Sequence, residues 1–182
     1  MDNDEQSNLL RWTGNEAISS RWAKRAEIVG KMIPPQASVL DIGCGNQILT
    51  EFLFKSVKYT PADIIARTED TIILDIDKEI WPTGKWDYIT ACGVLEYIHD
   101  LNSFFKNSTP LAKNIILTYH ISHNRQTLDG KKRRAQLGWL SNYSLADIIR
   151  MGDKYHWIIK SITCPTPKTH CSQYFIHFYI NE

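Results

Sequence analysis

The fold of this chain is decided by one stretch, Val39-Leu40-Asp41-Ile42-Gly43-Cys44-Gly45-Asn46. Residues 38–42 form a short apolar run that ends at two closely spaced glycines, and apolar residues at helical spacing follow from Ile48 to Leu53. A short run of this kind is typical of a buried strand, and the spacing after it indicates a helix. The pattern therefore predicts a strand, a glycine turn and a helix, in that order.

Similar patterns extend outward from this unit. Further candidate strands cover residues 58–64, 71–76, 86–92 and 114–119. One helix is expected to end before Pro34-Pro35, a second is capped by Asp100, and a third is opened by Ser144 and ends near Gly152.

The C-terminal part of the chain breaks the alternation. Its last two apolar runs, 155–163 and 172–180, are joined by a short proline-containing segment without a helix, which predicts an antiparallel pair. Together the runs predict a single α/β domain. Its core is a Rossmann-like, doubly wound, seven-stranded sheet with an antiparallel C-terminal strand.

The composition is that of an ordinary globular protein. The 182 residues are 43% hydrophobic, and 21 Lys and Arg balance 20 Asp and Glu. Because this balance gives no overall field, we expect no DNA partner and no membrane association. The acidic N-terminus lacks the features of a secretory signal, so a cytoplasmic location is expected. Four widely spaced cysteines predict neither a disulfide framework nor a metal site, and His170 beside Cys171 is only a weak hint of metal binding.

Three carboxylates stand at or near the ends of three successive predicted strands. Asp41 comes just before the glycine turn, Asp63 follows Gly43 by 20 residues, and Asp75 is near the end of the third run. Such ends meet at the ligand crevice of a doubly wound sheet, where these carboxylates can hold an ammonium group, the hydroxyls of a ribose and an exocyclic amine. A dinucleotide fingerprint needs a third glycine where this chain has Ile48. Each carboxylate alone also fits a turn or a helix cap.

With these residues the sequence resembles the class I S-adenosylmethionine-dependent methyltransferases over residues 36–180. The resemblance implies S-adenosyl-L-methionine as cofactor and a reversed seventh strand. This chain departs from the family pattern at Gln47, where a third glycine is common, and at Tyr97, where many members have His. The motifs that carry it are Val39–Asn46, Asp63, Asp75-Ile76 and Gly93-Val94-Leu95-Glu96-Tyr97.

The resemblance also implies a set of cofactor-binding residues. Asp41 and the two glycines of the turn would lie along the methionine part, Asp63 would take the ribose hydroxyls, and Asp75 would meet the adenine. The expected set is Asp41, Gly43, Gly45, Asn46, Asp63, Ile64, Asp75, Ile76 and Gly93.

Candidate catalytic residues follow the fourth and fifth predicted strands. They are Glu96, Tyr97, Tyr119, His120 and His123. His120 is the leading general base, because the ordinary pKa of imidazole suits proton removal near neutral pH. A loop hydrogen bond is the alternative role for His120, and Glu96 at a helix start is also favoured by the helix dipole.

Two further segments are expected to border the acceptor. Residues 120–142 are predicted to be a solvated loop. Its basic residues, Arg125 and Lys131–Arg134, could alternatively bind an anionic acceptor. Residues 1–35 are predicted to be an N-terminal helical segment or lid, with Trp12 as an aromatic wall or surface anchor and Trp22 in the core, ahead of a methyltransferase domain at 36–182.

The leading hypothesis is methyl transfer by in-line displacement to a small-molecule or glycan acceptor, with a hydroxyl as the favoured acceptor atom. The alternatives are a protein or amine N-methyltransferase, and a regulatory partner that binds S-adenosylmethionine without turning it over. An NAD-dependent oxidoreductase is disfavoured, since the chain has no room for a second, catalytic domain.

Overall fold

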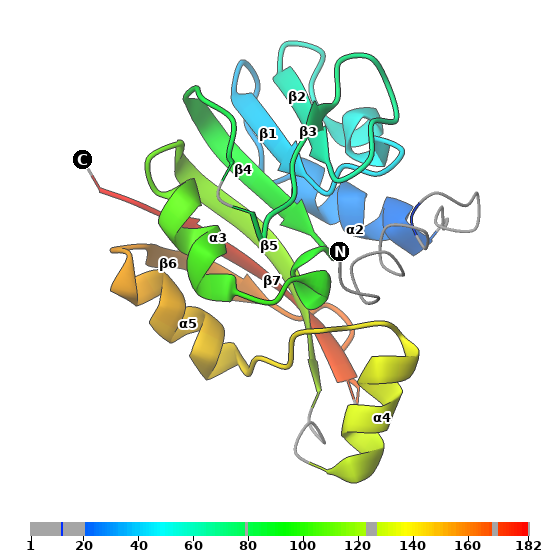
Figure 1. The fold of residues 1–182 in the computed structure, drawn as a ribbon. Coiled ribbons are helices and arrows are strands. Elements are labelled where there is room, and N and C mark those ends of the chain that lie inside the picture. Colours follow the sequence, from blue (N-terminus) through cyan, green and yellow to red (C-terminus); the bar gives the residue numbers. More distant parts are fainter. Residues whose placement is uncertain (1–11, 13–20, 79, 123–126, 169–170, 182) are drawn as a thin grey trace.

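One seven-stranded sheet organises the chain (Figure 1). The computed structural model describes residues 12, 21–78, 80–122, 127–168 and 171–181. The strand order is β3-β2-β1-β4-β5-β7-β6, in which the first five are parallel and β7 runs antiparallel to both of its neighbours. This confirms the predicted doubly wound sheet with its antiparallel C-terminal pair. The strands are β1 (Ser38–Ile42), β2 (Lys58–Asp63), β3 (Ile72–Ile73), β4 (Trp86–Cys92), β5 (Ala112–Ser122), β6 (Ile158–Thr163) and β7 (Cys171–Tyr179).

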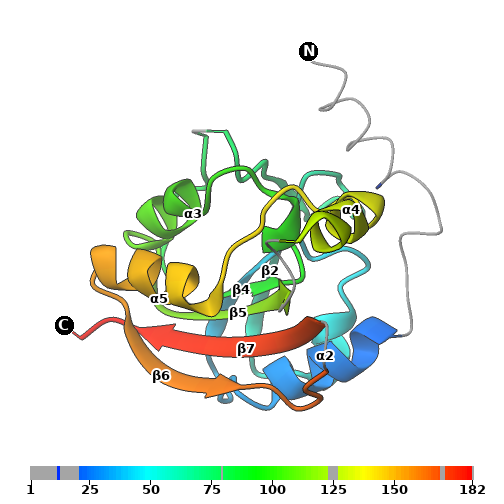
Figure 2. The ribbon, with the colours of Figure 1, turned by 90° about the horizontal axis from the view of Figure 1, so that it is seen from below.

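Helices cover both faces of the sheet (Figure 2). Helix α2 (Arg21–Gly30) packs on one face, and α3 (Leu101–Ser108) and α5 (Leu145–Lys154) pack on the other. The two predicted caps are present: Asp100 accepts a hydrogen bond from the backbone N–H of Asn102, and Ser144 forms a capping box with Asp147.

The connections between the first four strands contain less α-helix than predicted. The expected helix after β1 is a 3-10 helix, η2 (Ile48–Phe52), which lies so close to α2 that a side chain on Gly30 would collide with Phe52. In the described residues no helix joins β2 to β3 or β3 to β4. Strand β3 is also short, because the chain turns where the Asp75 carboxylate accepts a hydrogen bond from Asp77 N.

The expectation of a loop over residues 120–142 is wrong in part, because this segment contains helix α4 (Leu128–Gln136). The side chain of Thr127 caps it by accepting a hydrogen bond from Gly130 N. Lys131, Lys132 and Arg133 are exposed, as a basic run usually is, but Arg134 is buried. His123 and Arg125 lie outside the described residues.

The role expected of Gly152 as the end of its helix is also wrong. Helix α5 continues to Lys154, and Gly152 is buried inside it. A Cβ at this position would lie 2.8 Å from the Phe178 ring on β7. Gly152 is therefore a packing residue that lets α5 approach the sheet.

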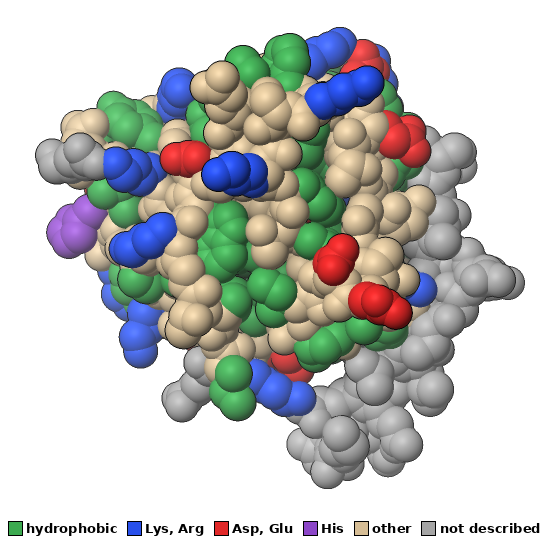
Figure 3. Space-filling model, turned by 90° about the horizontal axis from the view of Figure 1, so that it is seen from above, with side chains coloured by type: hydrophobic (Ala, Val, Ile, Leu, Met, Phe, Trp, Pro, Cys, Tyr) green, Lys and Arg blue, Asp and Glu red, His purple; other side chains and the backbone are tan. Residues whose placement is uncertain are grey.

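The surface at the end of the sheet that Figure 3 shows carries no single large charged patch. Lys and Arg side chains lie scattered among acidic, polar and hydrophobic ones in this view. Among the described helices, none is long and apolar enough to cross a membrane.

Candidate active site

The glycine turn after β1 has the backbone that its sequence requires. Gly43 and Gly45 have φ values of 72° and 52°, in the left-handed region that glycine adopts without strain. A side chain on Gly43 would also collide with Val94, which follows β4. Asn46 is exposed next to the turn. The turn therefore brings bare backbone to the carboxyl end of the sheet.

Asp63 lies beside this turn, at the end of β2. One carboxylate oxygen accepts a hydrogen bond from Gly45 N at 2.8 Å, and the other accepts one from Ile65 N at 3.2 Å. Ile64, the next residue, is half-buried. The structure thus brings Asp63 together with the turn, as the sequence predicted.

Asp41 is 4% exposed, so it does not face an open crevice. Its two carboxylate oxygens accept hydrogen bonds from the hydroxyls of Thr90 at 2.6 Å and Tyr59 at 2.7 Å. Burial raises the pKa of Asp41 to about 6, although both hydroxyls favour the charged form. Asp41 therefore holds the hydroxyls of Thr90 and Tyr59 in place beneath the glycine turn.

Asp75 lies nearer the surface, after β3, where it forms an ion pair with Lys78 at 3.1 Å. Ile76 is buried in the core on the α3 side, so the side chain of Asp75 and the backbone around Ile76 are the groups available to a ligand. Asp77 accepts hydrogen bonds from His99 N and Asp100 N, and burial raises its pKa. Asp77 thus ties the end of β3 to the start of α3, a role its sequence context did not reveal.

Helix α2 brings two side chains close to the glycines after β1 and β4, which the sequence did not predict. The guanidinium of Arg25 covers Gly93, so that any side chain at this glycine would collide with it. Trp22 lies 3.7 Å from the position of a Cβ on Gly45. One signal was readable: Arg25 is a charged residue four positions before Val29, on the apolar stripe of the helix.

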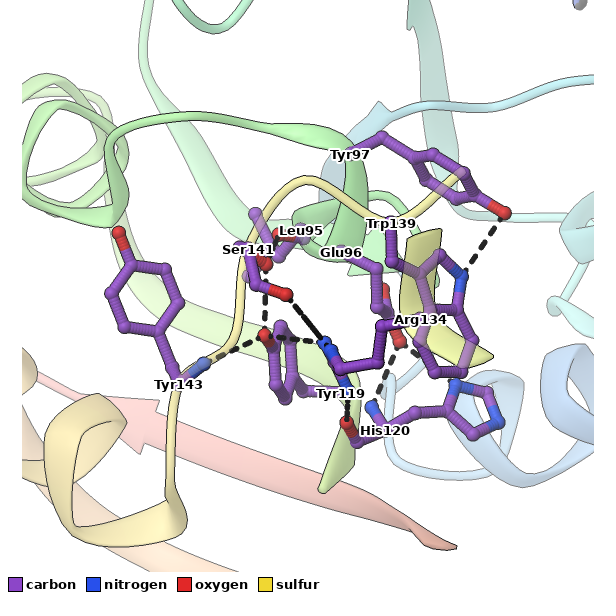
Figure 4. Close-up of polar contacts among 9 residues, drawn as sticks. All are labelled: Leu95, Glu96, Tyr97, Tyr119, His120, Arg134, Trp139, Ser141 and Tyr143. Carbon is purple, nitrogen blue, oxygen red and sulfur yellow. Dashed lines mark hydrogen bonds and ion pairs between the residues drawn. The ribbon is translucent and has the colours of Figure 1, made fainter. Parts of the chain in front are cut away.

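A close pair is formed by Glu96, in the 3-10 helix η3 (Leu95–Tyr97) after β4, and His120, near the end of β5 (Figure 4). Glu96 Oε1 lies 2.8 Å from His120 Nδ1 and accepts a second hydrogen bond, also 2.8 Å long, from His120 N. Glu96 is 1% exposed, and its other oxygen has no hydrogen-bond partner. Burial alone would raise the pKa of Glu96, but the hydrogen bond and charge of His120 hold it below the ordinary value. The carboxylate is therefore ionised at neutral pH.

Aromatic side chains surround this pair. The indole of Trp139 stacks on the His120 ring with centroids 5.0 Å apart, and its Nε1 donates to the Tyr97 hydroxyl at 3.2 Å. Trp12 packs edge-on against Tyr97, and its carbonyl accepts a hydrogen bond from Arg67 after β2. Trp139 had no signal in the sequence, since it stands in a polar segment without a motif.

Two cysteine thiols near the glycine turn, those of Cys44 and Cys92, stay protonated at neutral pH. Burial raises the pKa of the Cys44 thiol far above its ordinary value and that of Cys92 to about 12, so neither is a thiolate at neutral pH. In the described part of the chain no cluster of three or more His, Cys, Asp or Glu could hold a metal ion. The pair His170 and Cys171 lies outside the side chains described.

Solved structures with a similar fold include two methyltransferases. The chain resembles the N-methyltransferase NodS from Bradyrhizobium japonicum WM9, solved with S-adenosyl-L-homocysteine, at 15% identity and TM-score 0.68 over 100% of both chains. It also resembles the magnesium protoporphyrin IX methyltransferase ChlM from Synechocystis PCC 6803, solved with S-adenosyl-L-homocysteine, at 14% identity and TM-score 0.68, over 98% of this chain and 95% of that one. No curated protein sequence matches the chain significantly.

The family assignment rests on the sequence itself. A family model described as a methyltransferase domain matches residues 15–175. The positive-φ glycine turn, the carboxylate of Asp63 beside it and the guanidinium of Arg25 fit the methionine and ribose groups of S-adenosyl-L-methionine. The chain therefore belongs to the methyltransferase-domain family and is an S-adenosylmethionine-dependent methyltransferase.

Proposed function

We propose that this methyltransferase acts on a hydroxyl group of a small molecule, with His120 as general base and Glu96 as the residue that orients it. The observation that carries the proposal is the Glu96 Oε1 to His120 Nδ1 distance of 2.8 Å. A carboxylate on Nδ1 fixes the proton there and leaves Nε2 unprotonated, ready to accept a proton. The His120 side chain is 31% exposed, and Nε2 has no hydrogen bond to the described residues.

The residues proposed to hold the cofactor surround the glycine turn. Asp63 would accept the ribose hydroxyls, Asp75 would accept from the adenine amine, and Arg25 would pair with the methionine carboxylate. When bound, S-adenosyl-L-methionine supplies an electrophilic methyl group on a sulfonium.

Proton transfer is the task of the His120 pair. Nε2 of His120 takes the proton of the acceptor hydroxyl, which makes that oxygen a stronger nucleophile. The imidazolium that results is stabilised by the ionised Glu96 beside it, which stays in place without moving. A neutral amine acceptor does not need this base, so the pair favours a hydroxyl over an amine.

The surroundings of His120 favour a small acceptor with an apolar face. Tyr97, Trp139 and Trp12 offer aromatic rings next to the pair, and rings of this kind bind either a sugar ring or a flat molecule. Of the basic residues that suggested an anionic acceptor, Lys131, Lys132 and Arg133 are exposed on α4, and the buried Arg134 is hydrogen-bonded within the protein. Arg125 lies outside the described residues.

The test follows radioactive methyl transfer from S-adenosyl-L-methionine to a panel of phenols, glycosides and amines. We expect transfer to a hydroxyl acceptor, with kcat lowered by about 10²-fold or more in His120→Gln. His99→Gln, a substitution outside the pair, is the matched control and should keep its activity. Transfer to amines alone, or full activity of His120→Gln on a hydroxyl acceptor, would overturn the proposal.

A further inference from the structure

We propose that Arg134, a buried arginine on α4, is a positioning residue that holds His120 in place from the side opposite Glu96. The inference rests on the proposed role of His120 as base. It concerns the last residue in a basic run of four, a sequence context that suggested only a solvated side chain.

Strand β5 needs such support where His120 stands. The parallel register between β4 and β5 ends at the pair Cys92 and Thr118, so His120 has no neighbour on β4. On the other side β7 still pairs with it, through Gln173. The backbone N–H and C=O of His120 are thus left without ladder partners on the β4 side, where an unpaired group is costly.

Two side chains take the place of the missing strand (Figure 4). Glu96 accepts the hydrogen bond from His120 N, and Arg134 Nη1 donates to His120 O at 2.9 Å. Because Glu96 also binds the ring at Nδ1, the residue is held by its amide, its carbonyl and its imidazole.

Arg134 also holds the ring that packs on the base. Its guanidinium carbon lies 4.6 Å from the centroid of the Trp139 ring, which in turn stacks on His120. Loss of Arg134 would therefore release both the backbone of His120 and the indole against its imidazole.

The setting of Arg134 shows that it is built into this position. It is 4% exposed, and no ion pair to it is present in the described residues. Two of its other nitrogens donate to oxygens: Nε and Nη2 donate to Ser141 O at 3.1 and 2.6 Å, and Nη2 also donates to the Tyr119 hydroxyl at 2.9 Å. A buried cation is expensive, and a hydrophobic residue often fills such a place equally well. The hydrogen bond to His120 gives a reason to keep the arginine.

Tyr119 and Ser141 anchor this cation to the rest of the site. The Tyr119 hydroxyl accepts from Arg134 and from Tyr143 N, so its own proton goes to Ser141 Oγ, which donates to Leu95 O. The chain of bonds thus runs from α4 to the segment that carries Glu96. It passes through the Ser141 hydroxyl, whereas the hydrogen bonds from Arg134 and Glu96 to His120 do not.

The experiment reads the two ring nitrogens of His120 by NMR of protein labelled with ¹⁵N-histidine, with His120→Gln to assign the signals. In the wild type we expect a protonated Nδ1 and an unprotonated Nε2, hence two widely separated nitrogen shifts. Arg134→Gln should reduce that separation by about half or more, since a loosened ring exchanges between tautomers. Binding of S-adenosyl-L-homocysteine should change by less than about threefold, because Arg134 does not touch the residues proposed to hold the cofactor.

Two controls separate positioning from general stability. Arg133→Gln removes an exposed arginine from the same helix and should leave the shifts unchanged. Ser141→Ala weakens the buried network but keeps every hydrogen bond of Arg134, since Arg134 binds the backbone oxygen of Ser141. It should lower the thermal midpoint, while the Nδ1 and Nε2 shifts of His120 remain as widely separated as in the wild type.

The outcomes are distinct. An unprotonated Nδ1 in the wild type would refute the proposed function, because the Glu96 pair would not exist as described. Two outcomes would overturn the role of Arg134 alone, provided that the wild type shows the expected shifts. In the first, the separation of the two nitrogen shifts of His120 is unchanged in Arg134→Gln. In the second, Ser141→Ala reduces this separation as much as Arg134→Gln does. If Arg134→Gln does not fold, Arg134→Lys replaces it: a reduced separation supports the proposal, and an unchanged one overturns it.

Discussion

The carboxylate of Asp63 accepts a hydrogen bond from the backbone N–H of Gly45, so the end of β2 holds the glycine turn that follows β1. The bond is 2.8 Å long, and the second carboxylate oxygen makes a longer one, 3.2 Å, to Ile65 N. Asp63 thus shapes the turn even before any ligand arrives. We expect the same carboxylate to be the main polar anchor of the ribose.

Replacing this carboxylate tests both roles. Asp63→Asn can no longer accept with two charged oxygens, so we expect the Kd for S-adenosyl-L-homocysteine to rise by about tenfold or more, which is about 1.4 kcal/mol. Isothermal titration calorimetry measures it. Asp70→Asn, an exposed carboxylate after β2, is the matched control. An unchanged Kd in Asp63→Asn would place the ribose elsewhere.

Because the carboxylate of Asp41 is buried, we expect Asp41→Asn to be more stable than the wild type but to bind S-adenosyl-L-homocysteine less tightly. Because burial raises its pKa from 3.8 to about 6, the folded state binds more protons than the unfolded chain between these values. Stability therefore falls as the pH rises through this window. Asn cannot ionise, so Asp41→Asn should be more stable than the wild type at pH 7 by up to about 3 kcal/mol, and nearly equal to it near pH 3.5.

Denaturant unfolding at several pH values measures this difference. Asp70→Asn controls for the loss of one surface charge, and should follow the wild-type curve. A pH-independent gap between Asp41→Asn and the wild type would show that burial of the charge is not its cause. Binding of S-adenosyl-L-homocysteine to Asp41→Asn should weaken, since Tyr59 and Thr90 would lose their charged acceptor.

The fold was largely predictable from the sequence, because alternating apolar runs and glycine or proline breaks report strands directly. Strand β4 was predicted with its observed bounds, and both caps were found from their side chains. The 3-10 form of η2 and the shortness of β3 were not predictable, since they are shaped by contacts with α2 and by the turn at Asp75. Helix α4 was missed because its polar sequence has little apolar periodicity to detect.

The candidate site was predictable only where motifs exist. Asp41, Asp63 and Glu96 stand next to motif glycines or strand ends, and the sequence singled them out. It gave no warning that Asp41 is enclosed by two hydroxyls, because Tyr59 and Thr90 come from other strands. Residues brought in by tertiary packing, such as Arg134 and Trp139, have no local pattern that marks them.

Glu96→Gln tests the role of Glu96 in orienting and stabilising the base, while His120, the base itself, is kept. The amide keeps the size of Glu96 but cannot stabilise an imidazolium, so kcat on the hydroxyl acceptor should fall by about 10²-fold or more. The KM for the acceptor should change much less, because the aromatic rings are untouched. Steady-state kinetics with the acceptor identified in the panel measure both. Asp100→Asn, which changes a helix cap nearby, is the control; an active Glu96→Gln would remove Glu96 from the mechanism.

The close packing at Gly152 predicts that one methyl group added between α5 and the sheet destabilises the protein. The added Cβ of Gly152→Ala would lie 2.8 Å from Cε1 of Phe178, which is buried and cannot move away freely. Alanine favours a helix over glycine, but overpacking of this kind costs about 1–3 kcal/mol. We expect the thermal midpoint to fall by about 2–8 °C, measured by circular dichroism.

The double variant Gly152→Ala/Phe178→Leu identifies the cause. Leucine removes the ring that the new methyl group meets, so the substitution at Gly152 should cost less in its presence than in the wild type, with a coupling of about 0.5 kcal/mol or more. Asp153→Ala, at the next and exposed position, should change the midpoint by less than about 1 °C. If Gly152→Ala were as stable as the wild type, α5 would have room to shift, and the contact with Phe178 would not set its distance from the sheet.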